Sequence, residues 1–149
     1  MSNMFQMLEI SGSAMSAERQ RAEVVAANLA NSNTTRTTEG GPYKRKEVVF
    51  ASRNTSVFQY AFQQAMHLPG FPVPAVRVAQ VVTDPAPPLL RYEPGHPDAN
   101  AQGFVAYPAI NPIQEMVDLM GATRAYQLNA SAVNASKQMF QQAIDILRS

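Results

Sequence analysis

Residues 112–148 read PIQEMVDLMGATRAYQLNASAVNASKQMFQQAIDILR, and this stretch decides the fold. Asn111 is a good helix N-cap, Pro112 suits the first helical position, and Gln114 follows three residues after the cap, as in a capping box. No further proline and a single glycine interrupt the segment. These signals predict one helix from Pro112 to Arg148, which at 1.5 Å per residue is about 55 Å long.

Apolar residues recur every seven positions along this helix and define one contact stripe. A compact globule of this size has a radius of gyration of only about 15 Å, so the helix must project from it. Residues 125–136 carry no charge, which favours a helix touched on several sides over a low-charge helix exposed to water. The two apolar rows are Leu119, Tyr126, Val133, Phe140 and Leu147, and Met116, Thr123, Ala130, Lys137 and Ile144.

Residues 3–33 predict a second long helix with the same seven-residue spacing. Alanines beside its apolar stripe would allow another backbone to come close. The polar run at residues 31–33 competes for backbone hydrogen bonds and should end the helix. We expect Asn28 and Asn31 to cap this helix or to bond across an interface. The stripe consists of Leu8, Met15, Ala22, Val25 and Leu29.

All 11 prolines lie between Pro42 and Pro112, so two helices bracket a non-helical middle. The predicted fold is α+β: N- and C-terminal long helices form an antiparallel coiled-coil-like hairpin, with a small β-rich, proline-rich inserted domain. The expected division is residues 1–33, 34–111 and 112–149. Such a hairpin cannot cover both of its own faces, which indicates assembly with other subunits rather than an active site.

Period-two patterns between proline and glycine turns predict short strands in the middle of the chain. Residues 56–67 fit either a helix, because several apolar residues share one face, or a strand, because the segment is aromatic. Its aromatic residues have no interleaved Lys or Arg, which argues against a nucleic-acid platform. The predicted strands are residues 43–51, 75–83, 89–92 and 103–107.

Composition excludes several classes of function. The net charge is +1 and charged residues make up 15% of the chain, so no overall field favours nucleic acid or an acidic membrane. The absence of cysteine excludes a thiolate metal site, a disulfide framework and a cysteine nucleophile. We interpret the basic run at residues 44–46 as the solvated end of a strand. No leader peptide or membrane span is predicted.

The sequence contains no recognisable set of catalytic residues. His67 and His96 are the only histidines, and His96 with Asp98 gives one pair where a metal site needs three or four ligands. The chain lacks a nucleophile elbow, a glycine-rich phosphate loop and a zinc-protease helix. We therefore expect no catalytic, metal or cofactor site, and no enzyme.

The terminal segments resemble the bacterial flagellar rod and hook proteins. At the N-terminus the resemblance is carried by residues 10–17 (ISGSAMSA) and 27–34 (ANLANSNT), with Asn28–Asn31 (NLAN) its most specific part. Further segments resemble proximal rod subunits in particular, and the likeness covers about residues 5–50 and 84–147. These segments are residues 42–50 (PYKRKEVVF), 92–100 (YEPGHPDAN), 103–108 (GFVAYP), 115–120 (EMVDLM) and 124–127 (RAYQ).

The resemblance implies a structural subunit of the flagellar proximal rod, the helical drive shaft that carries motor torque through the periplasm to the hook. Members are exported unfolded through the flagellar type III apparatus without a cleaved signal. Their paired terminal helices would form the tube around the export channel. The implied partners are the chain itself, other rod subunits, the rod-base/MS-ring adaptor and surrounding basal-body components. The alternative is a non-flagellar secreted helical-hairpin adaptor, which would form a discrete dimer or heterodimer.

The residues expected to pack the helices and drive assembly come from the apolar rows and the adjoining amides, together with Met120. They are Leu8, Met15, Ala22, Val25, Asn28, Leu29, Asn31, Met116, Leu119, Met120, Tyr126, Val133, Phe140, Ile144 and Leu147.

Overall fold

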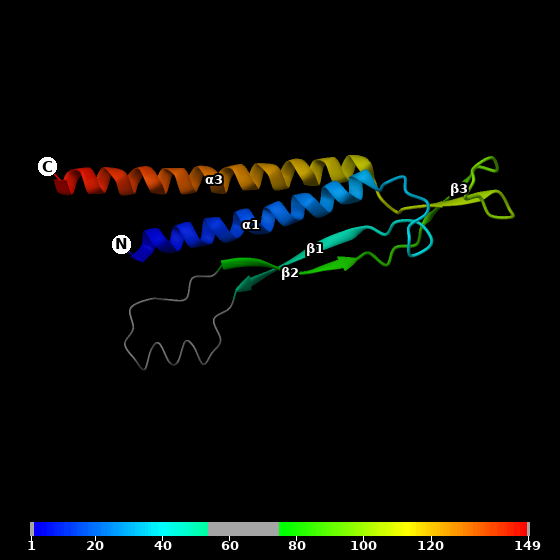
Figure 1. The fold of residues 1–149 in the computed structure, drawn as a ribbon, viewed down its shortest axis with the longest axis horizontal. Coiled ribbons are helices and arrows are strands. Elements are labelled where there is room, and N and C mark those ends of the chain that lie inside the picture. The colour runs from blue at the N-terminus through cyan, green and yellow to red at the C-terminus, as the bar shows by residue number, and fades with distance from the viewer. Residues whose placement is uncertain (1, 54–74, 149) are drawn as a thin grey trace, which may run out of the picture. The chain divides into compact units, whose positions relative to one another are not determined.

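The computed structural model of the chain describes residues 2–53 and 75–148, with side chains over residues 5–52 and 75–146. The described residues form two long helices and four strands, and the α+β class is confirmed (Figure 1). The ambiguous segment at residues 56–67 lies outside the described residues. The elements are α1 (Ser2–Ala30), β1 (Lys46–Arg53), β2 (Ala75–Thr83), β3 (Leu89–Tyr92), β4 (Phe104–Tyr107) and α3 (Pro112–Arg148).

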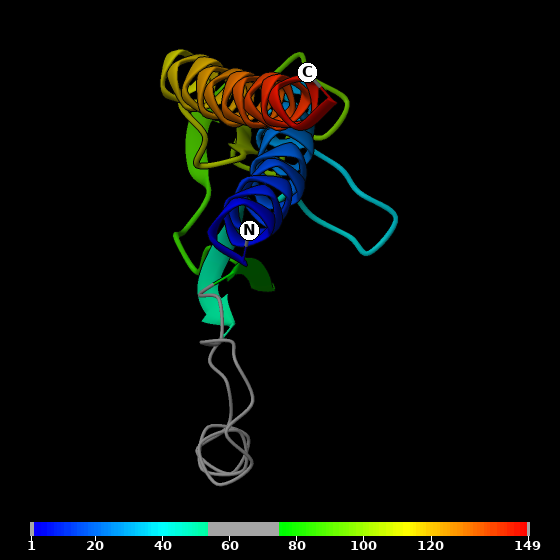
Figure 2. The same cartoon turned by 90° about the vertical axis from the view of Figure 1, so that its left-hand side faces the viewer.

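Both helices are continuous (Figure 2). Local hydrogen bonds define the N-terminal end of α3 and the C-terminal end of α1. Asn111 Oδ1 accepts a bond from the Ile113 N–H at 3.0 Å, and the Glu115 N–H donates to the Asn111 carbonyl at 3.1 Å. Asn111 is therefore the N-cap that the sequence predicts for α3. At the end of α1, Asn31 donates to the Ala27 carbonyl from both its backbone N–H (3.1 Å) and its side-chain Nδ2 (2.9 Å).

The strands form two sheets of two strands each, β1 with β2 and β3 with β4. β3 and β4 are antiparallel, with Leu89 opposite Tyr107 and Tyr92 opposite Phe104. β1 begins at Lys46, later than the predicted residue 43. The reason is that the Tyr43 N–H donates to the Thr34 carbonyl at 3.0 Å, which ties this residue to the preceding loop.

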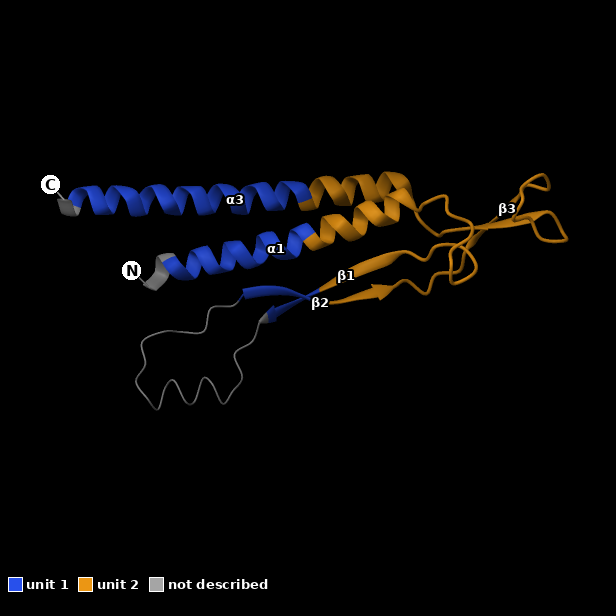
Figure 3. Cartoon of the chain, viewed as in Figure 1, with its two compact units in different colours: residues 1–19, 50–79, 123–149 blue, residues 20–49, 80–122 orange. Residues whose placement is uncertain are grey.

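The described chain divides into two compact units (Figure 3). Unit 1 contains residues 1–19, 50–79 and 123–149, and unit 2 contains residues 20–49 and 80–122. Each unit holds part of both helices and part of the strands.

In unit 1 the two helical segments run in opposite directions, since Phe5 meets Phe140 edge-on at 6.3 Å and the Ser136 hydroxyl donates to Met7 Sδ at 3.6 Å. The Val76 N–H donates to the Ser13 hydroxyl at 3.1 Å, so β2 contacts α1 here. Among the described residues of this unit, the buried side chains are small. They are Ser11, Ala17, Ala75 and Ser136.

In unit 2 the helical segments also run in opposite directions: the amide of Asn28 bonds to Glu115, and Arg21 pairs with Asp118 at 3.6 Å. The buried side chains of this unit are both apolar and polar, and several of them are larger than the buried ones described in unit 1. The buried residues include Val25, Asn28, Val105, Ile110, Glu115 and Ala122. In the part of the chain that the structure describes, neither helix has an apolar stretch long enough to cross a bilayer.

Gly103 in the β3–β4 connection gives a direct test of the fold. Its φ is +82°, and a Cβ there would lie 2.8 Å from Tyr92 Cε2 and 3.3 Å from Pro94 Cβ. We expect Gly103→Ala to lower the free energy of unfolding by about 1–3 kcal/mol, because an alanine is strained at this φ and collides with the Tyr92 ring. Urea denaturation followed by circular dichroism measures the change.

The matched control is Gly95→Ala, in the same connection. A Cβ at this position meets no atom within 4 Å. We expect a change within about 0.5 kcal/mol, as for ordinary surface positions. Equal effects of the two substitutions would contradict the described turn.

Candidate functional site

A buried polar cluster in unit 2 joins the end of α1, the start of β1 and the first turn of α3. Its centre is Asn28, which is 0% exposed. Asn28 Nδ2 donates to the Lys46 carbonyl at 2.8 Å and to Glu115 Oε2 at 3.0 Å. Asn28 Oδ1 accepts from the Lys46 N–H at 2.9 Å and from the Tyr43 hydroxyl at 3.2 Å. A primary amide has two donors and two acceptor lone pairs, so every hydrogen-bonding position of this side chain is used.

The Asn28 side-chain amide pairs with Lys46 as the backbone of an adjacent β-strand would. It bonds to both the N–H and the carbonyl of Lys46, the two groups that an adjacent strand would pair with. Lys46 is the first residue of β1. The side chain of one helix residue therefore holds the first residue of the strand, and the same side chain reaches the other helix at Glu115.

Glu115 is a fully buried carboxylate in the first turn of α3. Its Oε1 accepts from Arg45 Nε at 2.7 Å, and its Oε2 accepts from Asn28. The positive end of the helix macrodipole also favours a carboxylate in the first turn. Burying a charge is costly unless it is paired and hydrogen-bonded, and here both oxygens have a donor.

Arg45 connects Glu115 to further charges. Its side chain is 21% exposed and pairs with Glu47. Its Nη2 lies 3.9 Å from Asp118 Oδ2. Burial lowers the pKa of the Arg45 guanidinium, but the hydrogen bond and charge of Glu115 outweigh it, so the pKa is raised. Burial, and next the charge of Glu115, raise the pKa of Tyr43. Arg45 is thus charged and Tyr43 neutral at ordinary pH, as this hydrogen-bond pattern requires.

The interpretation of residues 44–46 as a solvated strand end is wrong for Arg45. Lys44 and Lys46 are exposed, but Arg45 points inward to Glu115, 70 residues away in the sequence. The alternation of neighbouring side chains in extended chain explains the difference, because it turns the middle residue to the face opposite its neighbours.

In unit 2, the loop that contains His96 and Asp98 contacts the loop that follows α1. The Asp98 N–H donates to His96 Nδ1 at 3.1 Å. The Asp98 carboxylate accepts from the Thr35 hydroxyl at 2.8 Å and pairs with Arg36 at 3.3 Å. Asp98 therefore ties two loops together. No group of three metal-ligating side chains occurs among the residues that the structure describes.

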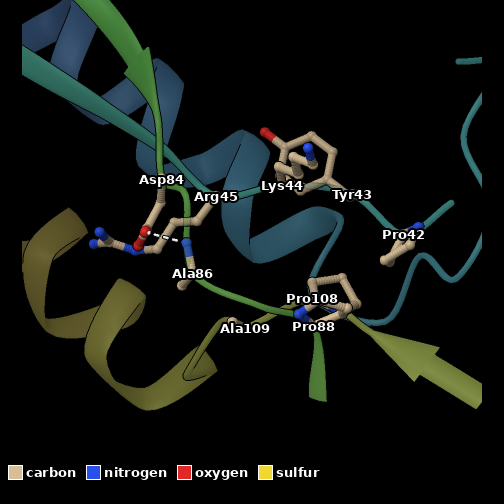
Figure 4. Close-up of a pocket in the computed structure, with 9 residues that line it drawn as sticks. All are labelled: Pro42, Tyr43, Lys44, Arg45, Asp84, Ala86, Pro88, Pro108 and Ala109. Carbon is tan, nitrogen blue, oxygen red and sulfur yellow. Dashed lines mark hydrogen bonds between the residues drawn. The ribbon is translucent and has the colours of Figure 1, made fainter. Parts of the chain in front are cut away.

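A shallow pocket lies beside the segment that leads into β1 (Figure 4). Proline rings from three separate connections surround it, and Asp84 Oδ1 accepts from the Ala86 N–H at 2.8 Å at its edge. Its lining combines apolar rings with a few charged groups, of which Arg45 is engaged with Glu115. The lining residues are Pro42, Tyr43, Lys44, Arg45, Asp84, Ala86, Pro88, Pro108 and Ala109.

The residues predicted for helix packing and assembly fall into two groups. Val25 and Asn28 are buried, and the half-buried positions are Leu8, Met15, Ala22, Leu29, Asn31, Leu119 and Val133. The others on α3 are exposed: Met116, Met120, Tyr126, Phe140 and Ile144. The side chain of Leu147 lies outside the described residues.

The sequence interpretation missed Glu115 and Arg45 as members of one site. The signal available for Glu115 is its spacing: Glu115, Ala122, Asn129 and Ser136 recur every seven residues and are buried or half-buried. A carboxylate in this buried row needs a cationic partner, because an unpaired buried charge is costly. Nothing local in the sequence identifies Arg45 as that cation.

Two family models match the chain. Residues 8–36 match the model described as "Flagella basal body rod protein", and residues 101–146 match "Flagellar basal body rod FlgEFG protein C-terminal". Asn28 lies in the first match and Glu115 in the second.

Full-length relatives agree with these matches. The chain is 36% identical over 149 residues to the flagellar basal-body rod protein FlgC of Borreliella burgdorferi, covering 97% of this chain and 98% of the relative. Identity to FlgC of Bacillus subtilis is 40% over 146 residues, covering 95% of this chain and 97% of the relative. Identity to FlgC of Escherichia coli O6:H1 is 38% over 138 residues, covering 93% of each.

The same relatives bear on the competing interpretations. All three are named as rod proteins, and they give no support to a non-flagellar secreted adaptor. Assembly with other rod components and a place in the flagellar basal body follow at the level of the family. The chain therefore belongs to the FlgC family of flagellar basal-body rod proteins, as a structural subunit of the proximal rod.

Proposed function

We propose that this chain polymerises through heterologous interfaces into the helical shaft that transmits motor torque to the hook. Heterologous contacts do not close into a ring when the rotation between subunits is accompanied by a rise, and they then build a filament. In this proposal residues 1–33 and 112–149 form a coiled-coil-like antiparallel hairpin around the export channel. Residues 34–111 pack outside it as the inserted domain.

One observation carries the proposal: large apolar side chains are exposed along α3 of the single chain. Met116 is 52% exposed and Met120 is 65% exposed. Burying one such side chain contributes roughly 1.5–3 kcal/mol. Contiguous exposed apolar surface in a soluble chain marks an interaction site. The other exposed apolar residues of α3 are Ile113, Val117, Tyr126, Leu128, Met139, Phe140, Ile144 and Ile146.

The remaining assembly residues serve the helix pair itself. Val25 and Asn28 are buried within the chain, with half-buried Leu8, Met15, Ala22 and Leu29 along the same helix. On α3, Leu119 and Val133 are half-buried. We assign these residues to packing inside the subunit and the exposed ones to contacts with neighbouring subunits.

We infer the further partners from family membership. The subunit would pass unfolded through the flagellar type III export apparatus without a cleaved signal. It would then assemble in the periplasm with itself, with other rod subunits, with the rod-base/MS-ring adaptor and with surrounding basal-body components.

Shortening α3 tests the proposal. A chain ending at Ser136 lacks Phe140 and Ile144, both exposed. In a strain without its own copy of this subunit, the full chain should restore basal bodies with complete rods, and the shortened chain should not. Electron microscopy and immunoblotting of purified basal bodies measure incorporation.

A full-length control carries Gln138→Ala and Gln142→Ala, which change two exposed polar residues in the same stretch. This variant should assemble. Rods built from the shortened chain at normal length and number would contradict the proposal. A discrete dimer of the full chain, without incorporation into basal bodies, would do the same.

A further inference from the structure

The seven-residue spacing of α1 and α3 is compatible with more than one alignment of the two helices. Buried or half-buried rows include residues 11, 18 and 25 on α1 and residues 115, 122, 129 and 136 on α3. Sliding one helix by seven residues keeps each row on the same face of its helix and changes which of its members meet the other helix. The helical period alone therefore does not select one alignment.

The polar cluster distinguishes strongly between them. Asn28 and Glu115 are both fully buried, and their hydrogen bonds are satisfied only when these two positions meet. A slip of seven residues would bring Asn28 away from Glu115 and leave a buried carboxylate with fewer donors. Removing a partner from a buried charge or amide carries a large penalty.

The cluster also fixes the strand. Asn28 bonds to the backbone of Lys46, and Arg45 bonds to Glu115. A slipped helix pair would lose both links at once, because each passes through Asn28 or Glu115. One alignment satisfies two helices and the start of β1 together.

We propose that Asn28, Arg45 and Glu115 form a register key, which selects one alignment of α1 against α3 at the expense of those displaced by seven residues. The key acts in the single chain, before any rod forms. Its failure and the failure of rod assembly are therefore separate results. Buried polar residues that specify register have this role in coiled coils.

The test replaces the key by apolar residues of similar size: Asn28→Leu, Arg45→Met and Glu115→Leu together. The chain has no cysteine, so Gln20→Cys introduces a single site for a nitroxide spin label on an exposed position of α1. Paramagnetic broadening of backbone amide signals then marks the stretch of α3 nearest the label. A slip of seven residues moves the centre of that stretch by seven residues.

With the native key we expect one broadened stretch. In the apolar triple variant we expect a second stretch displaced by seven residues, with the slipped-to-native ratio raised at least about tenfold, while helicity by circular dichroism is retained. A control triple, Asn134→Leu, Arg124→Met and Gln138→Leu, makes similar changes at exposed positions and should keep the single stretch. A folded key variant with the single native stretch would overturn the proposal.

Glu115→Gln covers the case in which the triple variant does not fold. It preserves the shape, but one amide cannot accept from both Asn28 and Arg45 through separate oxygens. The slipped population should again rise about tenfold relative to the native key, since losing one such bond costs on the order of 1.4 kcal/mol. An unchanged broadening profile in this variant would also overturn the proposal.

Discussion

Glu115→Ala is expected to lower the free energy of unfolding of the chain by about 3–5 kcal/mol, the cost of removing one partner from a buried ion pair. The substitution leaves Arg45, whose side chain is only 21% exposed, without its buried carboxylate partner. It also removes the acceptor of one Asn28 Nδ2 bond. Urea denaturation followed by circular dichroism at 222 nm measures the loss.

Glu47→Ala is the matched control, because Glu47 pairs with the same Arg45 but its side chain is 53% exposed. Exposed ion pairs contribute at most about 1 kcal/mol. We expect the two substitutions to differ by at least about 2 kcal/mol. A similar loss of unfolding free energy in both variants would mean that the burial of Glu115 does not determine how much its ion pair stabilises the chain.

Met120→Asp is expected to prevent incorporation of the subunit into the rod while leaving the single chain folded. Met120 is 65% exposed, so the change in the free energy of unfolding should stay within about 0.5 kcal/mol. In the rod a carboxylate at this position would be buried against a neighbour without a partner. A penalty of about 2–5 kcal/mol per contact corresponds to binding weakened by roughly 30-fold to several thousandfold.

Basal-body purification followed by immunoblotting measures incorporation, and swimming in soft agar reports the consequence. Met120→Leu is the control, since it retains an apolar side chain of similar volume and should assemble. Met120→Asp found in rods at the normal level would show that this face of α3 stays in water. The assignment of the exposed apolar residues to subunit contacts would then be wrong.

The helix ends and most strands could be predicted from the sequence because short-range chemistry determines them. Asn111 and Pro112 specify the start of α3, and the observed cap has the expected bonds. β2 and β3 lie between proline and glycine turns and have the predicted bounds. The spacing of apolar residues and the positions of turn-forming prolines and glycines are local properties of the chain. A single sequence is therefore sufficient to predict the elements that they define.

The polar cluster could not be predicted, because its bonds join residues far apart in the chain. Asn28 and Glu115 are 87 residues apart, and Arg45 and Glu115 are 70 residues apart. Arg45 lies in a basic run that has the composition of an exposed segment. Only the fold brings Glu115 against its middle residue.

Apolar spacing also cannot distinguish a face that packs inside the subunit from one that packs outside. Val25 and Met120 are both apolar residues predicted for helix packing and assembly, yet Val25 is 6% exposed and Met120 is 65% exposed. A helix that contacts partners on several sides is apolar on several sides. The sequence pattern is the same for both kinds of contact.

Amide hydrogen exchange on the dilute single chain and on assembled rods tests most directly whether the long helices are completed only by neighbouring subunits. In the single chain we expect protection of residues 112–122, where the cluster holds α3, and exchange at least about 100-fold faster over residues 123–146. In rods, residues 123–146 should become protected. Strong protection of the whole of residues 112–148 in the dilute chain, unchanged on assembly, would contradict the account.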